Sequence, residues 1–204
     1  EGRADIVALA RPLLADPELP NKLKAGKADQ VSPCLRCMAC ISESFVPYVR
    51  YCSRIRRCPS NPTAYKEIPA SQVKKAEQPK KVLVIGGGPS GMEAAAELAE
   101  RGHHVILCER ENELGGAMRH AKYVPFKQKV DQLMHVMIRR LERSGAEIRL
   151  RTAATPTLVE SLHPDVIVAA LGAKAKKPEV AGAEHAIIAE DALQRIDSLG
   201  QNVA

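Results

Sequence analysis

Three cysteines stand close together in this sequence, and a fourth is followed directly by proline: Cys34, Cys37, Cys40 and Cys58. Two residues separate neighbours in the triple run, so one tight loop can present three thiolates to a compact inorganic cluster. A remote cysteine followed by proline completes such a set in bacterial ferredoxins. Disulfides within so short a loop would be strained. The pattern therefore predicts an iron-sulfur cluster site.

The fourth ligand and the metal each have an alternative. Cys52 also lies downstream of the triple run, but Cys58 is preferred. The proline after Cys58 lacks a backbone donor and turns the chain sharply, which suits a ligand that closes a site. Zinc is the alternative metal, although zinc sites usually combine two separated cysteine pairs. A zinc site would indicate a nucleotide-binding regulatory module without redox activity.

A glycine-rich turn follows an apolar run further along the chain. Gly86, Gly88 and Gly91 occupy the three glycine positions of a dinucleotide-binding turn. The first permits the tight turn, the second lets the backbone approach a pyrophosphate, and the third lets a helix pack closely on a strand. Pro89 and Ser90 open that helix, whose free N–H groups favour phosphate.

An acidic residue completes the nucleotide pattern. Glu109 follows the second apolar run, where a carboxylate would accept hydrogen bonds from both ribose hydroxyls. FAD and NAD both carry that ribose, so these residues leave the two cofactors open. Gly115 and Gly116 would permit the approach of the second half of a longer cofactor. Adjacent glycines are equally typical of an ordinary flexible turn.

Hydrophobic periodicity predicts an α/β scaffold for these groups. Short β-branched runs predict strands, helical spacing predicts helices between them, and their alternation indicates a parallel sheet. The expected strands are residues 81–85, 104–108, 146–150 and 165–170, and the expected helices are residues 89–101 and 126–143. Residues 4–10, ADIVALA, also predict a short buried strand. A lone strand lacks backbone partners, so the rest of its sheet is expected before residue 1.

Composition restricts the class of protein. A hydrophobic content of 45% is enough for a core, and the absence of Trp with only two Phe argues against base stacking. The net charge of +6 is dispersed among both signs. No apolar run has the length of a membrane span. Crowded cysteines fit a reducing compartment. We therefore expect a cytoplasmic protein with a small-molecule substrate and neither nucleic-acid nor membrane partners.

Three segments together carry a family resemblance: ADIVALARPLLADPELPNKLKAGKADQ, CLRCMAC with CPSNP, and KVLVIGGGPSGMEAAAELAERGHHVILCER. They resemble the 2,4-dienoyl-CoA reductase and trimethylamine dehydrogenase group of old-yellow-enzyme-like NADH:flavin oxidoreductases. The resemblance implies the end of an FMN-binding TIM barrel over residues 1–30 and a cluster segment over residues 31–70. A linker over residues 71–80 and the first part of a Rossmann-like FAD domain over residues 81–204 would follow.

The same resemblance implies an electron path and its ligands. Electrons would pass from NAD(P)H through FAD and a 4Fe-4S cluster to FMN, where an enoyl-type substrate is reduced or an amine is oxidised. The cluster would be held by Cys34, Cys37, Cys40 and Cys58, and the FMN phosphate by Ala10 and Arg11. FAD would contact Gly86, Gly88, Pro89, Ser90, Gly91, Glu109, Arg110, Gly116 and Lys127.

No catalytic residue is expected in this chain, because groups that protonate a substrate would lie in the barrel. The resemblance leaves the substrate, the choice of NADH or NADPH and oligomer formation open. The chain also departs from the family pattern, since the stretch from Cys40 to Cys58 is longer than usual and contains Cys52.

Overall fold

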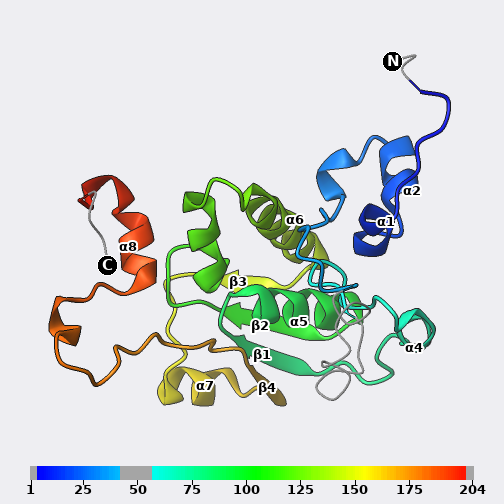
Figure 1. The fold of residues 1–204 in the computed structure, drawn as a ribbon. Coiled ribbons are helices and arrows are strands. Elements are labelled where there is room, and N and C mark those ends of the chain that lie inside the picture. Colours follow the sequence, from blue (N-terminus) through cyan, green and yellow to red (C-terminus); the bar gives the residue numbers. More distant parts are fainter. Residues whose placement is uncertain (1–3, 42–56, 201–204) are drawn as a thin grey trace, which may run out of the picture. The chain divides into compact units, whose positions relative to one another are not determined.

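The computed structural model describes residues 4–41 and 57–200 (Figure 1). The chain divides into two compact units, one up to residue 74 and one from residue 75. The break lies within residues 71–80, the stretch expected to be a linker. Among the described residues, none of the helices has the length and apolar character needed to cross a bilayer.

The described residues of the first unit form several short helices. Proline occupies the first turn of α1 and of α2, where its missing N–H costs no helical hydrogen bond. The elements are α1 (Arg11–Ala15), α2 (Leu19–Lys24), a 3-10 helix (Ala28–Gln30) and α4 (Glu67–Ser71).

Residues 4–10 form no strand, so the prediction of a buried strand there is wrong for this structure. Ile6 and Val7 are 89% and 71% exposed. A strand requires hydrogen-bonding partners from a neighbouring strand, and the described residues supply none to this segment. An apolar β-branched run by itself therefore does not produce a strand.

A buried carboxylate organises the first unit. The side chain of Asp16, a residue only 3% exposed, accepts hydrogen bonds from the backbone N–H groups of Glu18 and Ser32, at 3.1 and 2.8 Å. The same carboxylate accepts a bond from Lys22 Nζ at 2.7 Å. These contacts join the start of α2 to the segment that leads into the first cysteine. Because a buried carboxylate is costly without partners, the three bonds make this arrangement strongly preferred.

The second unit is built on a four-stranded parallel sheet of order β3-β2-β1-β4. The predicted parallel α/β sheet is thereby confirmed. The strands are β1 (Lys81–Ile85), β2 (His104–Cys108), β3 (Glu147–Arg149) and β4 (Val166–Ala169). The helices are α5 (Pro89–Glu100), α6 (Gln128–Ser144), α7 (Pro156–Leu162) and α8 (Ala189–Gln194), with 3-10 helices at Gly116–Tyr123, Ala183–His185 and Ile196–Ser198.

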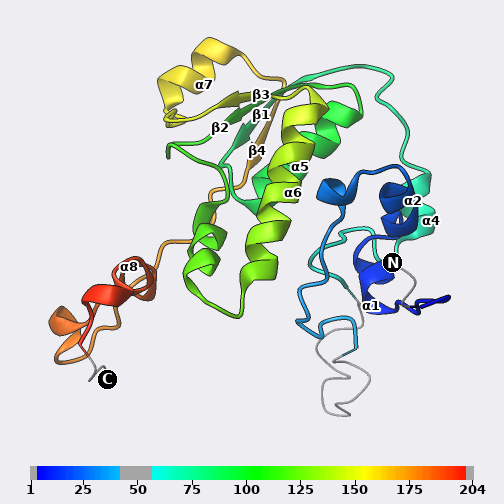
Figure 2. The ribbon, with the colours of Figure 1, turned by 90° about the horizontal axis from the view of Figure 1, so that it is seen from above.

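Helices cover both faces of this sheet (Figures 1 and 2). Leu83 of β1 and Ile106 of β2 are buried against α7, which contributes Leu158. The neighbouring residues of β1, Val82 and Val84, point to the opposite face and are also buried. A strand buried on both faces needs apolar residues at every position, which explains the continuous run in the sequence.

One arginine joins the two helices that lie next to each other, α5 and α6. Arg140 of α6 contacts carboxylates of Glu93, Glu97 and Glu100 on α5 at 2.7, 3.0 and 2.7 Å. The side-chain bond to Glu100 is the largest of the effects that raise the pKa of Arg140. The three carboxylates lie on one face of α5 and repel one another without this cation.

We expect Arg140→Ala to lower the free energy of unfolding by about 1 kcal/mol, a fall in Tm of roughly 2–4 °C. Thermal unfolding at low and high salt measures the effect, which should shrink as salt screens the carboxylates. Arg143→Ala removes an exposed cation from the same helix and should change Tm little. Equal effects of the two substitutions would contradict this role for Arg140.

Candidate cofactor sites

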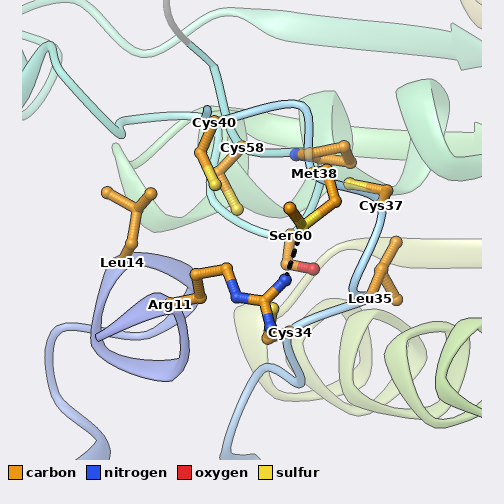
Figure 3. A pocket seen from close by; sticks show the side chains of 10 residues that line it. Arg11, Leu14, Cys34, Leu35, Cys37, Met38, Cys40, Cys58 and Ser60 are labelled. Carbon is orange, nitrogen blue, oxygen red and sulfur yellow. Dashed lines mark hydrogen bonds between the residues drawn. The ribbon is translucent and has the colours of Figure 1, made fainter. Parts of the chain in front are cut away.

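The four predicted cluster ligands line one hollow in the first unit (Figure 3). Cys34, Cys37 and Cys40 come from one loop, and Cys58 comes from the chain that follows residue 56. Thiolates are soft ligands that suit iron-sulfur clusters and zinc, so the donor set fits the predicted group. Among the described residues, no three His, Cys, Asp or Glu side chains are gathered closely enough for a single metal ion.

The backbone of the cysteine loop is coiled by two residues in the left-handed region. Arg36 has a φ of 57° and Met38 a φ of 62°. Residues other than glycine rarely adopt such angles, and they concentrate at ligand sites. These two residues lie on either side of Cys37, in the loop whose three cysteines line the hollow.

Buried polar contacts bring Cys58 to this loop. Ser60 Oγ donates to the carbonyl of Pro33 at 2.7 Å, and Asn61 Nδ2 donates to the carbonyl of Leu14 at 2.9 Å. Ser60 and Asn61 are 9% and 7% exposed. The turn after Cys58 is thus attached both to the start of the triple run and to α1. Sequence reasoning did not identify Ser60 and Asn61 as residues that position the site.

The pKa of Cys58 reflects its surroundings in the hollow. Burial raises the pKa of the Cys58 thiol, and the nearby Cys37 and Cys34 raise it further, whereas backbone hydrogen bonds from Ser60 and Asn61 lower it. Several thiolates in one place would repel one another unless a cationic centre bound them. Cys52, the alternative fourth ligand, lies outside the described residues.

Arg11 lies at the same hollow. Its Nη1 donates to Met38 Sδ at 2.7 Å, and the side chain lines the hollow with the four cysteines (Figure 3). The family resemblance implied an FMN phosphate ligand at Arg11, together with Ala10, which is exposed at the start of α1. The proximity of Arg11 to the cysteines was missed, because it depends on how the chain folds between them.

The first glycine turn connects β1 to α5 and leaves no room for a side chain at Gly86 or at Gly91. Gly86 has a φ of 108°, and its N–H donates to the carbonyl of Cys108 at 2.9 Å. A Cβ at Gly91 would collide with the carbonyl oxygen of Gly86. The predicted close packing of strand and helix at Gly91 is therefore present in the fold. At Gly88 the nearest neighbour of an added Cβ is Gly116 Cα, at 3.9 Å, so this position is open.

The second glycine turn lies directly against the first. The N–H of Gly115 donates to the carbonyl of Gly87 at 2.8 Å. A Cβ at Gly116 would lie 3.1 Å from Gly88 Cα, and both Gly115 and Gly116 have positive φ. Two turns that are distant in sequence therefore form one continuous backbone surface. An ordinary flexible turn, the alternative interpretation, has no such contacts.

Glu109 also belongs to this surface. It is 7% exposed, and its Oε2 accepts a bond from the Gly87 N–H at 2.6 Å, while Oε1 accepts one from the Glu111 N–H at 2.9 Å. The carboxylate therefore holds the first turn, a role that sequence reasoning did not assign to it. Its orientation is set before any ribose binds, which reduces the entropy cost of binding.

The remaining predicted cofactor contacts lie around these turns or beyond them. Pro89 opens α5, and Ser90 is exposed in its first turn. Arg110 has a side chain that is 80% exposed and lies 3.2 Å from a carboxylate oxygen of Glu111. Lys127 is exposed immediately before α6. The structure brings Pro89 and Ser90 to the glycine turn and leaves Lys127 on another element.

Comparison with known proteins matches residues 81–200 to a family described as FAD-dependent oxidoreductases. The chain belongs to this family. The matched range includes both glycine turns and Glu109. Among curated relatives of this family member, an NADH oxidase of Thermoanaerobacter brockii is 40% identical over 90% of the chain and 28% of the relative. A cinnamate reductase of Clostridium sporogenes is 37% identical over 99% of the chain and 30% of the relative.

A solved structure supports the same family assignment. The complex of 2-naphthoyl-CoA reductase with 2-naphthoyl-CoA matches with a TM-score of 0.79 and 33% identity, over 90% of this chain and 27% of that one. These relatives confirm the resemblance to NADH:flavin oxidoreductases. The chain spans under a third of the length of the relatives it matches. None of these relatives supports a zinc-stabilised regulatory module.

Within the first glycine turn of this FAD-dependent oxidoreductase, we expect different outcomes for two alanine substitutions. Gly91→Ala should destabilise the fold by about 2–3 kcal/mol, because the new methyl group collides with backbone that cannot move away. Gly88→Ala should leave Tm nearly unchanged, because its backbone angles suit any residue and the space is open. It should nevertheless weaken flavin binding at least about tenfold, because the methyl group faces an incoming pyrophosphate.

Thermal unfolding and flavin titration of both variants check this pair of expectations. Loss of stability in Gly88→Ala, or normal flavin affinity together with normal stability in Gly91→Ala, would contradict the assigned geometry.

Proposed function

We propose that this chain is the electron-transferring part of an iron-sulfur flavoprotein oxidoreductase. FAD would lie on the paired glycine turns, and a 4Fe-4S cluster would lie in the cysteine hollow. In the whole protein, electrons would pass from NAD(P)H through FAD and the cluster to FMN, where an enoyl-type substrate is reduced. Oxidation of an amine is the alternative reaction that the family resemblance offers. We place the protein in the cytoplasm.

One observation carries this proposal. Four cysteines line a single hollow in the same chain that holds a family-matched FAD domain. A nucleotide turn alone would suit many proteins, and a cysteine hollow alone would suit zinc. Their combination supports redox chemistry, because a flavin exchanges electrons in pairs or singly and an iron-sulfur cluster accepts them singly.

The residues of the glycine turns would bind and orient the nucleotide. Gly88 is open to the pyrophosphate, and the N-terminus of α5 presents free N–H groups and a partial positive charge to it. Glu109 already has its carboxylate fixed by backbone donors and retains lone pairs for ribose hydroxyls. The chain itself would therefore supply binding and orientation of the nucleotide.

The residues around the cysteine hollow would hold the cluster and set its charge environment. Left-handed backbone at Arg36 and Met38 would help to present the three cysteines of the loop, and the polar contacts of Ser60 and Asn61 would position the fourth. The Arg11 guanidinium adds a positive charge beside these thiolates. Hydrogen bonds, burial and nearby charge are the means by which proteins adjust cluster potentials.

The whole protein, purified without oxygen, tests the proposal directly. We expect bound flavin with visible absorbance bands, iron and acid-labile sulfide, and bleaching of both chromophores on addition of NADH or NADPH. Oxidation of the nicotinamide coupled to loss of an aryl-enoate double bond would support the enoyl substrate class. Colourless protein with stoichiometric zinc would overturn the proposal.

The fourth cluster ligand can be identified by a pair of serine substitutions. Cys58→Ser should abolish retention of iron and sulfide, because Cys58 lines the hollow with the other three cysteines. Cys52→Ser should retain both. Iron and sulfide analysis of the anaerobic proteins checks the assignment, and the reverse pattern would move the ligand to Cys52.

The charge of Arg11 gives a second expectation for the cluster. Arg11→Gln should lower the reduction potential of the cluster by tens of millivolts, because a nearby cation favours the more negative reduced form. Potentiometric titration followed by EPR measures it. Arg36→Gln removes an exposed cation that belongs to the same loop but not to the lining of the hollow, and should shift the potential less. An unchanged potential in Arg11→Gln would exclude this role.

A further inference from the structure

We infer that Arg119 is a positioning residue of the flavin site, which holds the second glycine turn in the conformation that meets the first. The inference rests on the proposed FAD site and adds a residue that neither the glycine pattern nor the family resemblance assigns. Arg119 lies in the 3-10 helix that follows the turn, and it acts on the turn rather than on the nucleotide.

Two hydrogen bonds and one packing contact connect Arg119 to the turn. Its Nε donates to the carbonyl of Gly116 at 3.0 Å, and its Nη1 donates to Glu113 Oε1 at 3.0 Å. Arg119 Cγ also fills the space beside Gly115, since it lies 2.8 Å from where a Cβ at Gly115 would be. The Arg119 side chain is only 22% exposed, whereas that of Glu113 is 55% exposed. One side chain thus contacts the turn at its start, middle and end.

The held conformation is one that the turn would not keep by itself. Gly115 and Gly116 have φ of 112° and 53°, and glycine readily adopts many other angles. In the observed conformation the Gly115 N–H bonds to the Gly87 carbonyl, and Gly116 approaches Gly88. Any other conformation separates the two turns. The nucleotide would then bind only the competent fraction of molecules, and its apparent affinity would fall by that fraction.

The chemistry of the guanidinium explains why arginine suits this position. Its planar group donates in two fixed directions at once, toward a carbonyl and toward a carboxylate. A lysine ammonium on its flexible stem keeps the charge, but it lacks that fixed geometry. We therefore expect a positive charge alone to be insufficient to hold the second glycine turn.

The test uses the full-length protein after removal and re-addition of FAD, with affinity followed by flavin fluorescence. Arg119→Met should weaken FAD binding about tenfold. Arg119→Lys should restore only part of that loss, and Glu113→Gln should weaken binding about two- to threefold, since its bond is more exposed. The Arg119→Met/Glu113→Gln double variant should bind no more weakly than Arg119→Met alone, because the pair acts as a unit.

Hydrogen exchange in the FAD-free protein distinguishes a local change at the turn from a general loss of stability. Arg119→Met should speed exchange of the Gly115 amide, which donates to Gly87, with little change at the β1 and β2 amides. Arg140→Gln is the matched control, since it removes the cation of the α5 and α6 contact. It should lower Tm without changing FAD affinity measured well below the unfolding transition.

The outcomes that contradict the inference differ from the outcome that contradicts the proposed function. Unchanged FAD affinity in Arg119→Met would overturn the inference. So would a loss in Arg119→Met with no effect of Glu113→Gln and no change in Gly115 exchange, because Arg119 would then contact the cofactor directly. Wild-type protein that binds no FAD would instead overturn the proposed function. If Arg119→Met fails to fold, Arg119→Lys and Glu113→Gln still decide the question by the same two measurements.

Discussion

The candidate nucleotide site depends on the contact between the backbone of Gly86 and the backbone at Gly91. There the carbonyl oxygen of Gly86 occupies the space that any side chain at Gly91 would require. This contact sets the distance between β1 and the first turn of α5, and so places the helix N-terminus at the end of the sheet. The second glycine turn, Glu109 and the open position at Gly88 are all arranged around that junction.

The first unit is organised by a different physical principle. Apart from Ala15 and Ala64, its described buried residues are polar, and they form hydrogen bonds over long sequence separations. Asp16 joins α2 to the segment before Cys34, and Asn61 joins the turn after Cys58 to α1. Such contacts are directional, so they can fix cysteine positions without a large apolar core. A bound cluster would add the cohesion that a core normally provides.

Sequence patterns predicted the second unit well because its elements follow local rules. The run at β1 is apolar throughout since both faces are covered, and the periodicity of α6 matches its buried Leu133 and Leu141. Gly145 ends α6 in the left-handed conformation. The strand expected at residues 4–10 failed for the opposite reason. Strand formation depends on a partner, which a local pattern does not contain.

The sequence by itself determined the chemistry that each site offers: thiolates at ferredoxin-like spacing, and glycines placed between a strand and a helix. Only the tertiary structure decided which groups meet. It brought Arg11 to Met38 across 27 residues and the Gly87 N–H to Glu109 across 22 residues, and it set Gly116 against Gly88. The physical reason is the distance along the sequence over which each effect acts. Backbone preferences and periodicity act over a few neighbouring residues, whereas these contacts depend on the path of the whole intervening chain.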